Sequence, residues 1–293
     1  MLKKIFCFAS DAKRENMEET PESKTVFAEY EFDSVIGNGA FSSVWKAKHK
    51  KTGDVVAIKS ANGKFNSSVV AKEYSVHTVM NHPNILAPLK FYHDFKQNST
   101  FLVFNKMDMD LFELAIERTN MNIHQVRNVL RQIAPAIAHM HDKNIVHRDI
   151  KPENIMFDGI GKFFLTDLGG CEHEDKMTIN TLVGTSSYLA PEIAEEYLIP
   201  GSNTFAVGKP SDIYSLGATL FAIATRVAPG PPNSKRTSTT AKLILRHDIH
   251  KYIDQYITDE NFADLLRSMT NRKPMMRLTI QEVMRHPFYI GGA

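Results

Sequence analysis

The chain has 293 residues, and at roughly 100 to 200 residues per domain this length suits one two-lobed unit or two modest domains. A small scaffold held together by disulfides is therefore excluded. Apolar residues make up 43% and charged residues 23%, which excludes a wholly disordered chain. The net charge of +2 lacks the positive field of nucleic-acid binders, so no nucleic acid is expected among the partners.

The two cysteines, Cys7 and Cys171, lie far apart in the chain. This spacing supports neither a disulfide framework nor a cysteine-pair metal site. A reducing intracellular compartment is therefore expected, namely the cytoplasm, with the nucleus as an additional location.

Residues 1–25 are predicted to form a mobile N-terminal extension. The apolar patch in Met1–Phe8 is too short for a signal peptide or a membrane span, and no later run is long and apolar enough to span. Residues 10–24 carry many charges and no aromatic residue, as solvated segments do. The folded domain is expected to begin near Val26. A membrane-surface role for the first eight residues is the weaker alternative to tethering or packing on the domain.

Between Val26 and Phe104 the pattern is mostly that of strands. The predicted strand segments are 27–37, 41–48, 54–60, 85–95 and 100–105. One helix interrupts them from about Ser67 to Met80, and the residues His82-Pro83-Asn84 are expected to end it.

Beyond Asp108 the pattern becomes mostly helical. Apolar residues recur at helical spacing from Asn122 to His141, which predicts an amphipathic helix. Its apolar stripe consists of Val126, Leu130, Ile133, Ile137 and Met140. The segment 212–225 is apolar on nearly every face and predicts a helix buried in the middle of a lobe. A zinc site is not expected on the helix from Asn122 to His141, because the side chains of His139 and His141 point about 200° apart around its axis.

Two glycines follow the first predicted strand, in the segment Ile36–Val44. Gly37 and Gly39 let backbone N–H groups approach a phosphate closely, although such a pair by itself more often marks a hairpin turn. The context is strand, loop, strand. A dinucleotide-binding fold requires strand, loop, helix, so that interpretation is disfavoured.

Lys59 directly follows the apolar strand residues 55–58. Burial pushes an unpaired lysine toward its neutral form, so an acidic partner is expected, and Glu73 on the following helix is the candidate. The alternative is an edge-strand lysine whose ammonium group reaches solvent.

The strongest chemical pattern is the segment HRDIKPEN at 147–154, which a DLG tripeptide follows. Asn154 and Asp167 offer the hard oxygen ligands that Mg²⁺ prefers. Asp149 and Lys151 are separated by one residue on a loop, where both can face one reacting phosphate. A solvated charged turn is the alternative interpretation.

With these elements in this order, the sequence resembles the eukaryotic protein kinases over about residues 30–290. The motifs that carry the resemblance are the glycine-rich loop, VAIK ending in Lys59, the helix residue Glu73, HRDIKPEN, DLG in place of DFG, Ala190-Pro191-Glu192, DIYSLG with Asp212, and Arg277 as the partner of Glu192. The resemblance implies an α+β fold of two lobes. A small β-rich N-lobe with one regulatory helix, together with the hinge, would take residues 26–107. A larger, mostly α-helical C-lobe would take residues 108–293.

The resemblance also implies that ATP and Mg²⁺ bind between the lobes. The residues implied for ATP are Ile36, Gly37, Asn38, Gly39, Ala40, Phe41, Val44, Ala57, Lys59, Glu73, Asn105, Met107, Asp110 and Met156, with Phe104 beside the back pocket. The glycine-rich loop would cover the phosphates, Lys59 would hold the α- and β-phosphates, and Asp110 would reach the ribose. Asn154 and Asp167 would coordinate the metal ions.

The reaction implied by the resemblance is transfer of the γ-phosphoryl group to protein hydroxyls. Asp149 would orient the substrate hydroxyl and accept its proton, while Lys151 would stabilise charge on the transferring group. Lys151 and Thr185 resemble the serine/threonine-specific pattern, so protein substrates with serine or threonine acceptors are the expected partners.

Two alternatives to this function are weighed on specific residues. A pseudokinase-type ATP-binding scaffold is disfavoured because the positions of Lys59, Asp149, Asn154 and Asp167 are all filled by the required residues. A small-molecule kinase of the aminoglycoside or choline type shares the lobes. Its members lack the elements that Glu192, Asp212 and Arg277 represent in this chain.

Regulation is expected at Arg148, Thr181 and Thr185. Relatives with an arginine at the position of Arg148 often order the activation segment with a phosphothreonine, and Thr181 is the matching acceptor. An upstream kinase or an activator protein is therefore a candidate partner. Because residues 171–175 are acidic, a further hypothesis pairs Glu172 or Glu174 directly with Arg148, leaving activity only partly dependent on phosphorylation. An exposed acidic loop tip is the alternative.

Overall fold

The computed structural model describes residues 25–39, 41–95, 97–118, 121–179, 182–202 and 208–291. Apart from Thr25, the extension predicted for residues 1–25 lies outside the described residues. The chain divides into two compact units, each described below by itself. Unit 1 comprises Met1–Asn81 and Ala87–Lys106, and unit 2 comprises His82–Leu86 and Met107–Ala293.

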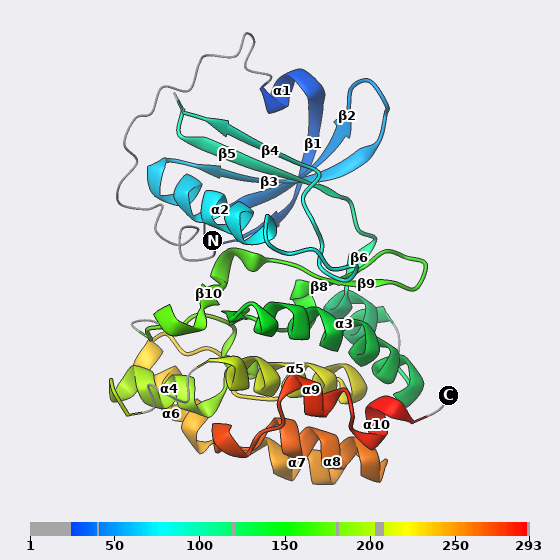
Figure 1. The fold of residues 1–293 in the computed structure, drawn as a ribbon, viewed down its shortest axis with the longest axis vertical. Helices are drawn as coiled ribbons and strands as arrows, with labels where there is room; N and C mark the ends of the chain where they lie inside the picture. Colours follow the sequence, from blue (N-terminus) through cyan, green and yellow to red (C-terminus); the bar gives the residue numbers. More distant parts are fainter. Residues whose placement is uncertain are drawn as a thin grey trace. The chain divides into compact units, whose positions relative to one another are not determined.

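Unit 1 is a five-stranded antiparallel sheet with one long helix (Figure 1). Its elements are α1 (Val26–Glu29), β1 (Tyr30–Asn38), β2 (Ser43–His49), β3 (Val55–Asn62), α2 (Lys64–His77), β4 (Lys90–Asp94) and β5 (Ser99–Asn105). The strand order is β1-β2-β3-β5-β4, and α2 packs against β3 and β5. Along β3, Val56 and Ile58 are buried whereas Val55 is exposed, which is the two-residue alternation of a strand with one covered face.

One hydrophobic cluster holds the sheet of unit 1 together. Its buried members are Val26, Tyr30, Ala47, Val56, Ile58, Phe101 and Val103, with Phe32 and Tyr92 packed against them. Aromatic residues supply much of this cluster, and their burial is the main stabilising contribution to a sheet of this size.

The predicted boundaries in unit 1 are wrong at three places. Residues 26–29 form the short helix α1 and not strand, and the ring of Phe27 packs on Phe32 and Phe101. Helix α2 begins at Lys64 and ends at His77, three residues earlier at each end than predicted. The helix starts early because Gly63, with φ of 86°, turns the chain directly out of β3.

The third difference concerns the predicted strand 85–95, of which only β4 forms. Residues 82–86 belong to unit 2, where the Leu86 N–H donates to the Leu165 carbonyl at 2.9 Å and the Leu165 N–H donates to the Asn84 carbonyl at 2.8 Å. Ile85 and Leu86 are therefore buried residues of unit 2, whereas Leu89 is exposed and belongs to unit 1. A continuous hydrophobic pattern in sequence does not distinguish one strand from two separate packing roles.

Unit 2 is mostly helical. Its strands are β6 (Met109–Asp110), β7 (Ile145–Val146), β8 (Ile155–Phe157), β9 (Phe163–Leu165) and β10 (Glu172–His173). Its α-helices are α3 (Ile123–Asp142), α4 (Pro191–Leu198), α5 (Lys209–Thr225), α6 (Thr237–Arg246), α7 (Ile249–Tyr256), α8 (Glu260–Met269), α9 (Ile280–Val283) and α10 (Pro287–Ile290). Its short 3₁₀ or π turns are η2 (Glu113–Arg118), η3 (Pro152–Asn154), η4 (Leu168–Gly170), η5 (Glu174–Lys176), η6 (Ser186–Tyr188) and η7 (Pro274–Met276).

Helices α3 and α5 pack together in the core of unit 2, as Figure 1 shows. Asn122 begins α3 with a capping box, because its side chain accepts from the N–H groups of His124 and Gln125. Helix α5 is buried along nearly its whole length, as predicted for residues 212–225. At Gly217 a Cβ atom would lie 2.9 Å from Met269, so glycine allows α5 to approach α8 closely. None of the helices within the described ranges combines the length and hydrophobicity that a membrane span needs.

Two histidines in unit 2 predict how its stability depends on pH. The rings of His82 and His139 lie 5.6 Å apart between centroids. Burial, His139 and Lys162 lower the pKa of His82 below its ordinary 6.5. Burial and Lys143 lower the pKa of His139, against an opposing effect of Asp142.

Because both histidine pKa values are lower in the folded protein, the unfolded chain binds more protons just below pH 6.5. Stability is therefore expected to rise with pH up to that value. The measurement is the urea midpoint at about pH 5.5 and about pH 7.5, and replacing both histidines by glutamine should reduce the difference. His124→Gln, at an exposed position on α3, should leave it unchanged; an equal reduction there would contradict the prediction.

Candidate active site

The glycine-rich loop is the turn between β1 and β2. The Gly39 N–H donates to the Ser42 carbonyl at 2.7 Å, and the Ser43 hydroxyl donates to Asn38 Oδ1 at 3.0 Å. Phe41 packs edge-on against Phe65 of α2, with 5.8 Å between ring centroids. These contacts close the loop as a tight hairpin between β1 and β2. Ala40, which belongs to the same predicted site, lies outside the described residues.

Lys59 and Glu73 form an ion pair within unit 1. Lys59 lies on β3 and Glu73 on α2, and Lys59 Nζ donates to Glu73 Oε2 at 2.6 Å. The Glu73 side chain is only 2% exposed and that of Lys59 15%, so each charge is compensated by the other away from bulk water. The contact expected from the sequence is therefore present.

Replacing Glu73 by glutamine is expected to lower kcat/KM for ATP about tenfold, because Lys59 loses the charged partner that orients it. Steady-state kinetics with varied ATP measure this effect. Glu31→Gln, at an exposed position on β1, is the matched control and should change nothing. Equal kinetics for the two variants would contradict an orienting role for Glu73.

The remaining residues predicted for ATP divide between the two units. Unit 1 holds Ile36, Gly37, Val44, Ala57, Phe104 and Asn105, and unit 2 holds Met107, Asp110 and Met156. Within the sheet of unit 1, Val44 pairs with Lys59 and Ala57 pairs with Phe104. Within unit 2, Asp110 pairs with Met156 across β6 and β8.

Asp110 is half-buried, and its carboxylate accepts the Glu113 N–H at 2.8 Å. Burial raises the pKa of this carboxyl group above its usual range, although the hydrogen bond opposes the shift. One oxygen of the Asp110 carboxylate therefore caps the start of the helical turn η2.

The catalytic loop holds the Asp149 carboxylate with three donors. Lys151 Nζ lies 2.9 Å from Asp149 Oδ2, and Asn154 Nδ2 donates to the same oxygen at 3.0 Å. The Thr185 N–H donates to Asp149 Oδ1 at 3.1 Å. Lys151 Nζ also donates to the Thr185 hydroxyl at 2.8 Å. The carboxylate is thus fixed in orientation by three other residues of the predicted site, Lys151, Asn154 and Thr185.

A backbone hydrogen bond in unit 2 connects the segments that carry the two predicted metal ligands, Asn154 and Asp167. Asn154 uses its amide nitrogen on Asp149, which leaves its side-chain oxygen for another partner. The Thr166 N–H donates to the Asn154 carbonyl at 3.0 Å, and Asp167 follows in a left-handed conformation with φ of 59°. An amide oxygen and a carboxylate at this place fit the hard-oxygen preference of Mg²⁺, whose other positions water and phosphate oxygens usually fill.

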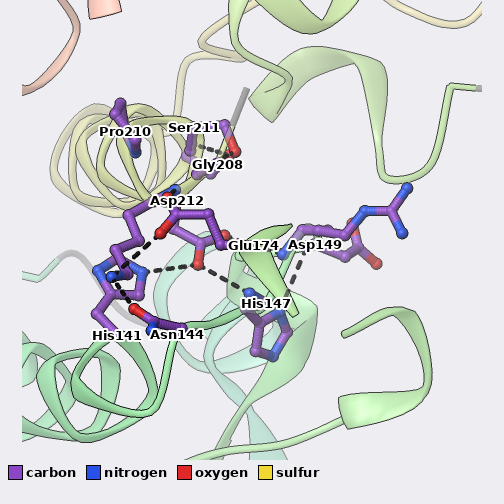
Figure 2. A network of polar contacts seen from close by, with 12 residues as sticks. His141, Asn144, His147, Asp149, Glu174, Gly208, Pro210, Ser211 and Asp212 are labelled. Atoms are coloured by element: carbon purple, nitrogen blue, oxygen red, sulfur yellow. Dashed lines mark hydrogen bonds and ion pairs between the residues drawn. The ribbon is translucent and has the colours of Figure 1, made fainter. Parts of the chain in front are cut away.

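A buried aspartate on α5 holds the catalytic loop (Figure 2). Asp212 accepts the N–H groups of His147 at 2.8 Å and Arg148 at 2.9 Å, and it contacts His141 Nε2 at 2.9 Å. Burial opposes its charge, but the hydrogen bond and charge of His141 and the contacts with His147 keep the pKa of Asp212 below its ordinary value. Arg148 can therefore keep its left-handed backbone, with φ of 74°.

The predicted pair of Glu192 and Arg277 is present and buried. Each terminal nitrogen of Arg277 donates to one Glu192 oxygen at 2.6 Å. The Arg277 Nε also donates to the Asn271 carbonyl at 2.6 Å. The pair therefore ties the start of α4 to the segment before α9.

The regulatory residues are only partly described. Thr181 lies outside the described residues. Burial lowers the pKa of Arg148, and the charge of Glu172 is the largest of the effects that oppose this shift. Glu174 forms an ion pair with Lys209 at 3.1 Å, so the hypothesis that it pairs with Arg148 is wrong. The fold brings Glu174 to α5 instead.

Two polar residues of the site were not predicted from the sequence. His141 supports Asp212, and the Thr166 carbonyl contacts His147 Nε2 at 3.0 Å. His141 lies four residues after Ile137 and so on the buried face of α3, which is the signal that could have identified it. No local pattern in the sequence pointed to Thr166.

The architecture defines the class of this protein. An antiparallel five-stranded sheet with one long helix, and a helical unit that carries the catalytic loop, make a two-lobed α+β kinase fold. The protein kinase domain family model matches residues 30–289. The chain therefore belongs to the protein kinase family, a family of phosphotransferases, and the resemblance seen in the sequence is confirmed.

Relatives in several organisms agree with this assignment. The chain is 27% identical to the probable serine/threonine-protein kinase fhkA of Dictyostelium discoideum over 90% of this chain and 50% of the relative. It is 28% identical to the phosphorylase b kinase gamma catalytic chain, liver/testis isoform, of Bos taurus, over 91% of this chain and 68% of the relative. It is 29% identical to an Aurora kinase of Schizosaccharomyces pombe over 89% of this chain and 71% of the relative. The chain thus spans half of the first relative and about two thirds of the others.

Proposed function

We propose that this protein transfers the γ-phosphoryl group of ATP to serine and threonine hydroxyls of protein substrates with the help of Mg²⁺. The observation that carries the proposal is the contact set of the Asp149 carboxylate with Lys151, Asn154 and Thr185. A carboxylate with a fixed orientation can position a substrate hydroxyl and accept its proton. The family relatives named serine/threonine kinases support the same reaction.

The residues have separate tasks in this proposal. Lys59, held by Glu73, binds phosphate oxygens, and Lys151 stabilises charge on the transferring group. Asn154 and Asp167 hold Mg²⁺, which screens the phosphate charge when it is bound. Lys151 and Thr185, whose pattern resembles that of serine/threonine-specific kinases, are in direct contact, and relatives named serine/threonine kinases support the same choice of acceptor.

Protein substrates follow from family membership. The proposal further includes an upstream kinase or activator protein as a partner, and a cytoplasmic or nuclear location. The alternative is an ATP-binding scaffold without transfer. The contacts of Asp149 favour the enzyme, because a scaffold has no need of an oriented base.

The test is transfer of label from ATP to a mixed library of serine and threonine peptides, with and without Mg²⁺. The purified protein is compared with Asp149→Ala. We expect transfer that needs Mg²⁺ and is lost in the variant. Binding of ATP without transfer by either protein, before and after incubation with a cell extract that supplies activators, would contradict the proposed function.

A further inference from the structure

Glu174 occupies a fixed place just after the DLG tripeptide. It begins η5, directly after β10, which pairs with β7 through Glu172 opposite Val146. The Glu174 N–H donates to the Asn144 carbonyl at 2.8 Å. The backbone therefore directs the Glu174 side chain from this strand pair toward α5.

The carboxylate of Glu174 reaches Lys209, the first residue of α5. Its Oε1 accepts the Lys209 N–H at 3.1 Å, and its Oε2 lies 3.1 Å from Lys209 Nζ. Lys209 Nζ also donates to Asn144 Oδ1 at 2.6 Å. The carboxylate thus satisfies one of the N–H groups that the start of a helix leaves unpaired.

Gly208 leaves the space that this carboxylate occupies. A Cβ atom at position 208 would clash with Glu174 Oε1. Its backbone φ of 162° is extended, so another residue could adopt the same conformation. A side chain at position 208 would therefore displace the carboxylate, while the backbone itself has no need of glycine.

Helix α5 is also the element that holds the catalytic loop. Asp212, three residues after Lys209, accepts the N–H groups of His147 and Arg148. The first turn of α5 therefore fastens the segment after DLG and the catalytic loop to one rigid support.

We propose that Glu174 is a positioning residue that fastens the activation segment to α5 without phosphorylation. We name the contact of Glu174 with Gly208 and Lys209 the Glu174 clasp. This inference rests on the proposed function and adds its regulation. The Glu174 carboxylate is part of the chain and therefore holds this segment in place at all times. A phosphate would hold the segment only after modification.

The helix-capping hydrogen bond contributes more to the clasp than the ion pair does. The side chains of Glu174 and Lys209 are each 31% exposed, and ion pairs so accessible to solvent stabilise little. A carboxylate that caps a helix is favoured by the helix dipole as well as by its hydrogen bond. Glu174→Gln keeps an oxygen for this bond and should be mild, whereas Glu174→Ala removes it.

The test uses the full chain carrying Thr181→Ala, so that no phosphate can form at that position. Amide hydrogen exchange of residues 171–179 and kcat for a peptide substrate are measured for four further substitutions. In Glu174→Ala and Gly208→Ala we expect exchange about fivefold faster and kcat about fivefold lower. Glu174→Gln should stay within about twofold. Asp175→Asn, whose carboxylate lies near His173 and is 81% exposed, is the matched control and should change neither quantity.

Three results would overturn the inference. Exchange in Glu174→Ala no faster than in Asp175→Asn would show that no clasp holds the segment. Faster exchange with unchanged kcat would remove its positioning role. Loss of nearly all activity in Thr181→Ala alone would make phosphorylation the positioning event. A wild-type protein inert toward every peptide contradicts the proposed function instead, while the exchange rates still decide whether Glu174 fastens the segment.

Discussion

Replacing Asp149 by asparagine is expected to lower kcat for phosphoryl transfer about a thousandfold, because the substrate hydroxyl loses the group that accepts its proton. The side chain keeps its size, so the change opens no cavity at this position. Steady-state kinetics with saturating ATP measure kcat, and a separate binding titration follows the affinity for ATP, which should change little.

The contacts of Asp149 explain why asparagine cannot make the same hydrogen bonds at this position. One carboxylate oxygen faces Lys151 and Asn154, and the other faces the Thr185 N–H. An amide group placed either way turns its own N–H toward a donor. We therefore expect the loop to loosen as well, with faster hydrogen exchange at Thr185.

The control for this variant is Asp264→Asn. Asp264 is 71% exposed and contacts His286. Its replacement by asparagine is the same chemical change at a position away from the catalytic loop. It should keep wild-type kinetics. If Asp149→Asn retained more than about a tenth of the wild-type kcat, Asp149 would not be the base.

Replacing Arg277 by methionine is expected to lower the free energy of unfolding of unit 2 by about 3–5 kcal/mol, because Glu192 keeps a buried charge without its partner. The two side chains are 0% and 1% exposed, and their two nitrogen–oxygen contacts are both 2.6 Å. The guanidinium also lies over the ring of Tyr214, 5.0 Å from its centroid. All these contacts would be lost together.

The measurement is urea denaturation followed by far-ultraviolet circular dichroism, which reports mainly on the helices of unit 2. Trp45, the only tryptophan, lies in unit 1, so its fluorescence reports the other unit in the same sample. Arg267→Met is the matched control: its partner Asp254 is 61% exposed and Arg267 itself 44%, so that change should cost less than about 1 kcal/mol.

A double variant separates the charge from the packing. Glu192→Leu combined with Arg277→Met removes both charges, and we expect it to recover most of the stability lost by Arg277→Met alone. If Arg277→Met unfolded as readily as Arg267→Met, the buried pair would have no special role in stability.

The sequence predicted best the elements whose side-chain pattern is strong and local. The stripe of α3 and the uniformly apolar α5 predict both helices to within a few residues. Prediction was poorer for α1 and for residues 85–89. In both, apolar residues follow one another without a clear period, and their packing partners decide the backbone conformation.

Within the site, the partner of the acidic segment after DLG was likewise decided by packing and not by the sequence pattern. The sequence offered Glu172 or Glu174 as a partner of Arg148, with an exposed loop tip as the alternative, but the partner of Glu174 is Lys209, 35 positions along the chain. Both arginine and lysine would neutralise a glutamate equally well. Only the pairing of β10 with β7 directs the side chain to α5.

For this protein the sequence by itself identified the groups that we propose to carry the chemistry and indicated which of them are close together. Asp149, Lys151 and Asn154 lie within six consecutive positions, so a single loop brings them into contact whatever surrounds it. The tertiary structure alone decided what supports that loop. Asp212 and Thr185 are distant in the sequence, and a buried charge requires a partner without specifying one. The packing of helices and strands makes that choice, because it sets which remote donors lie within hydrogen-bond distance.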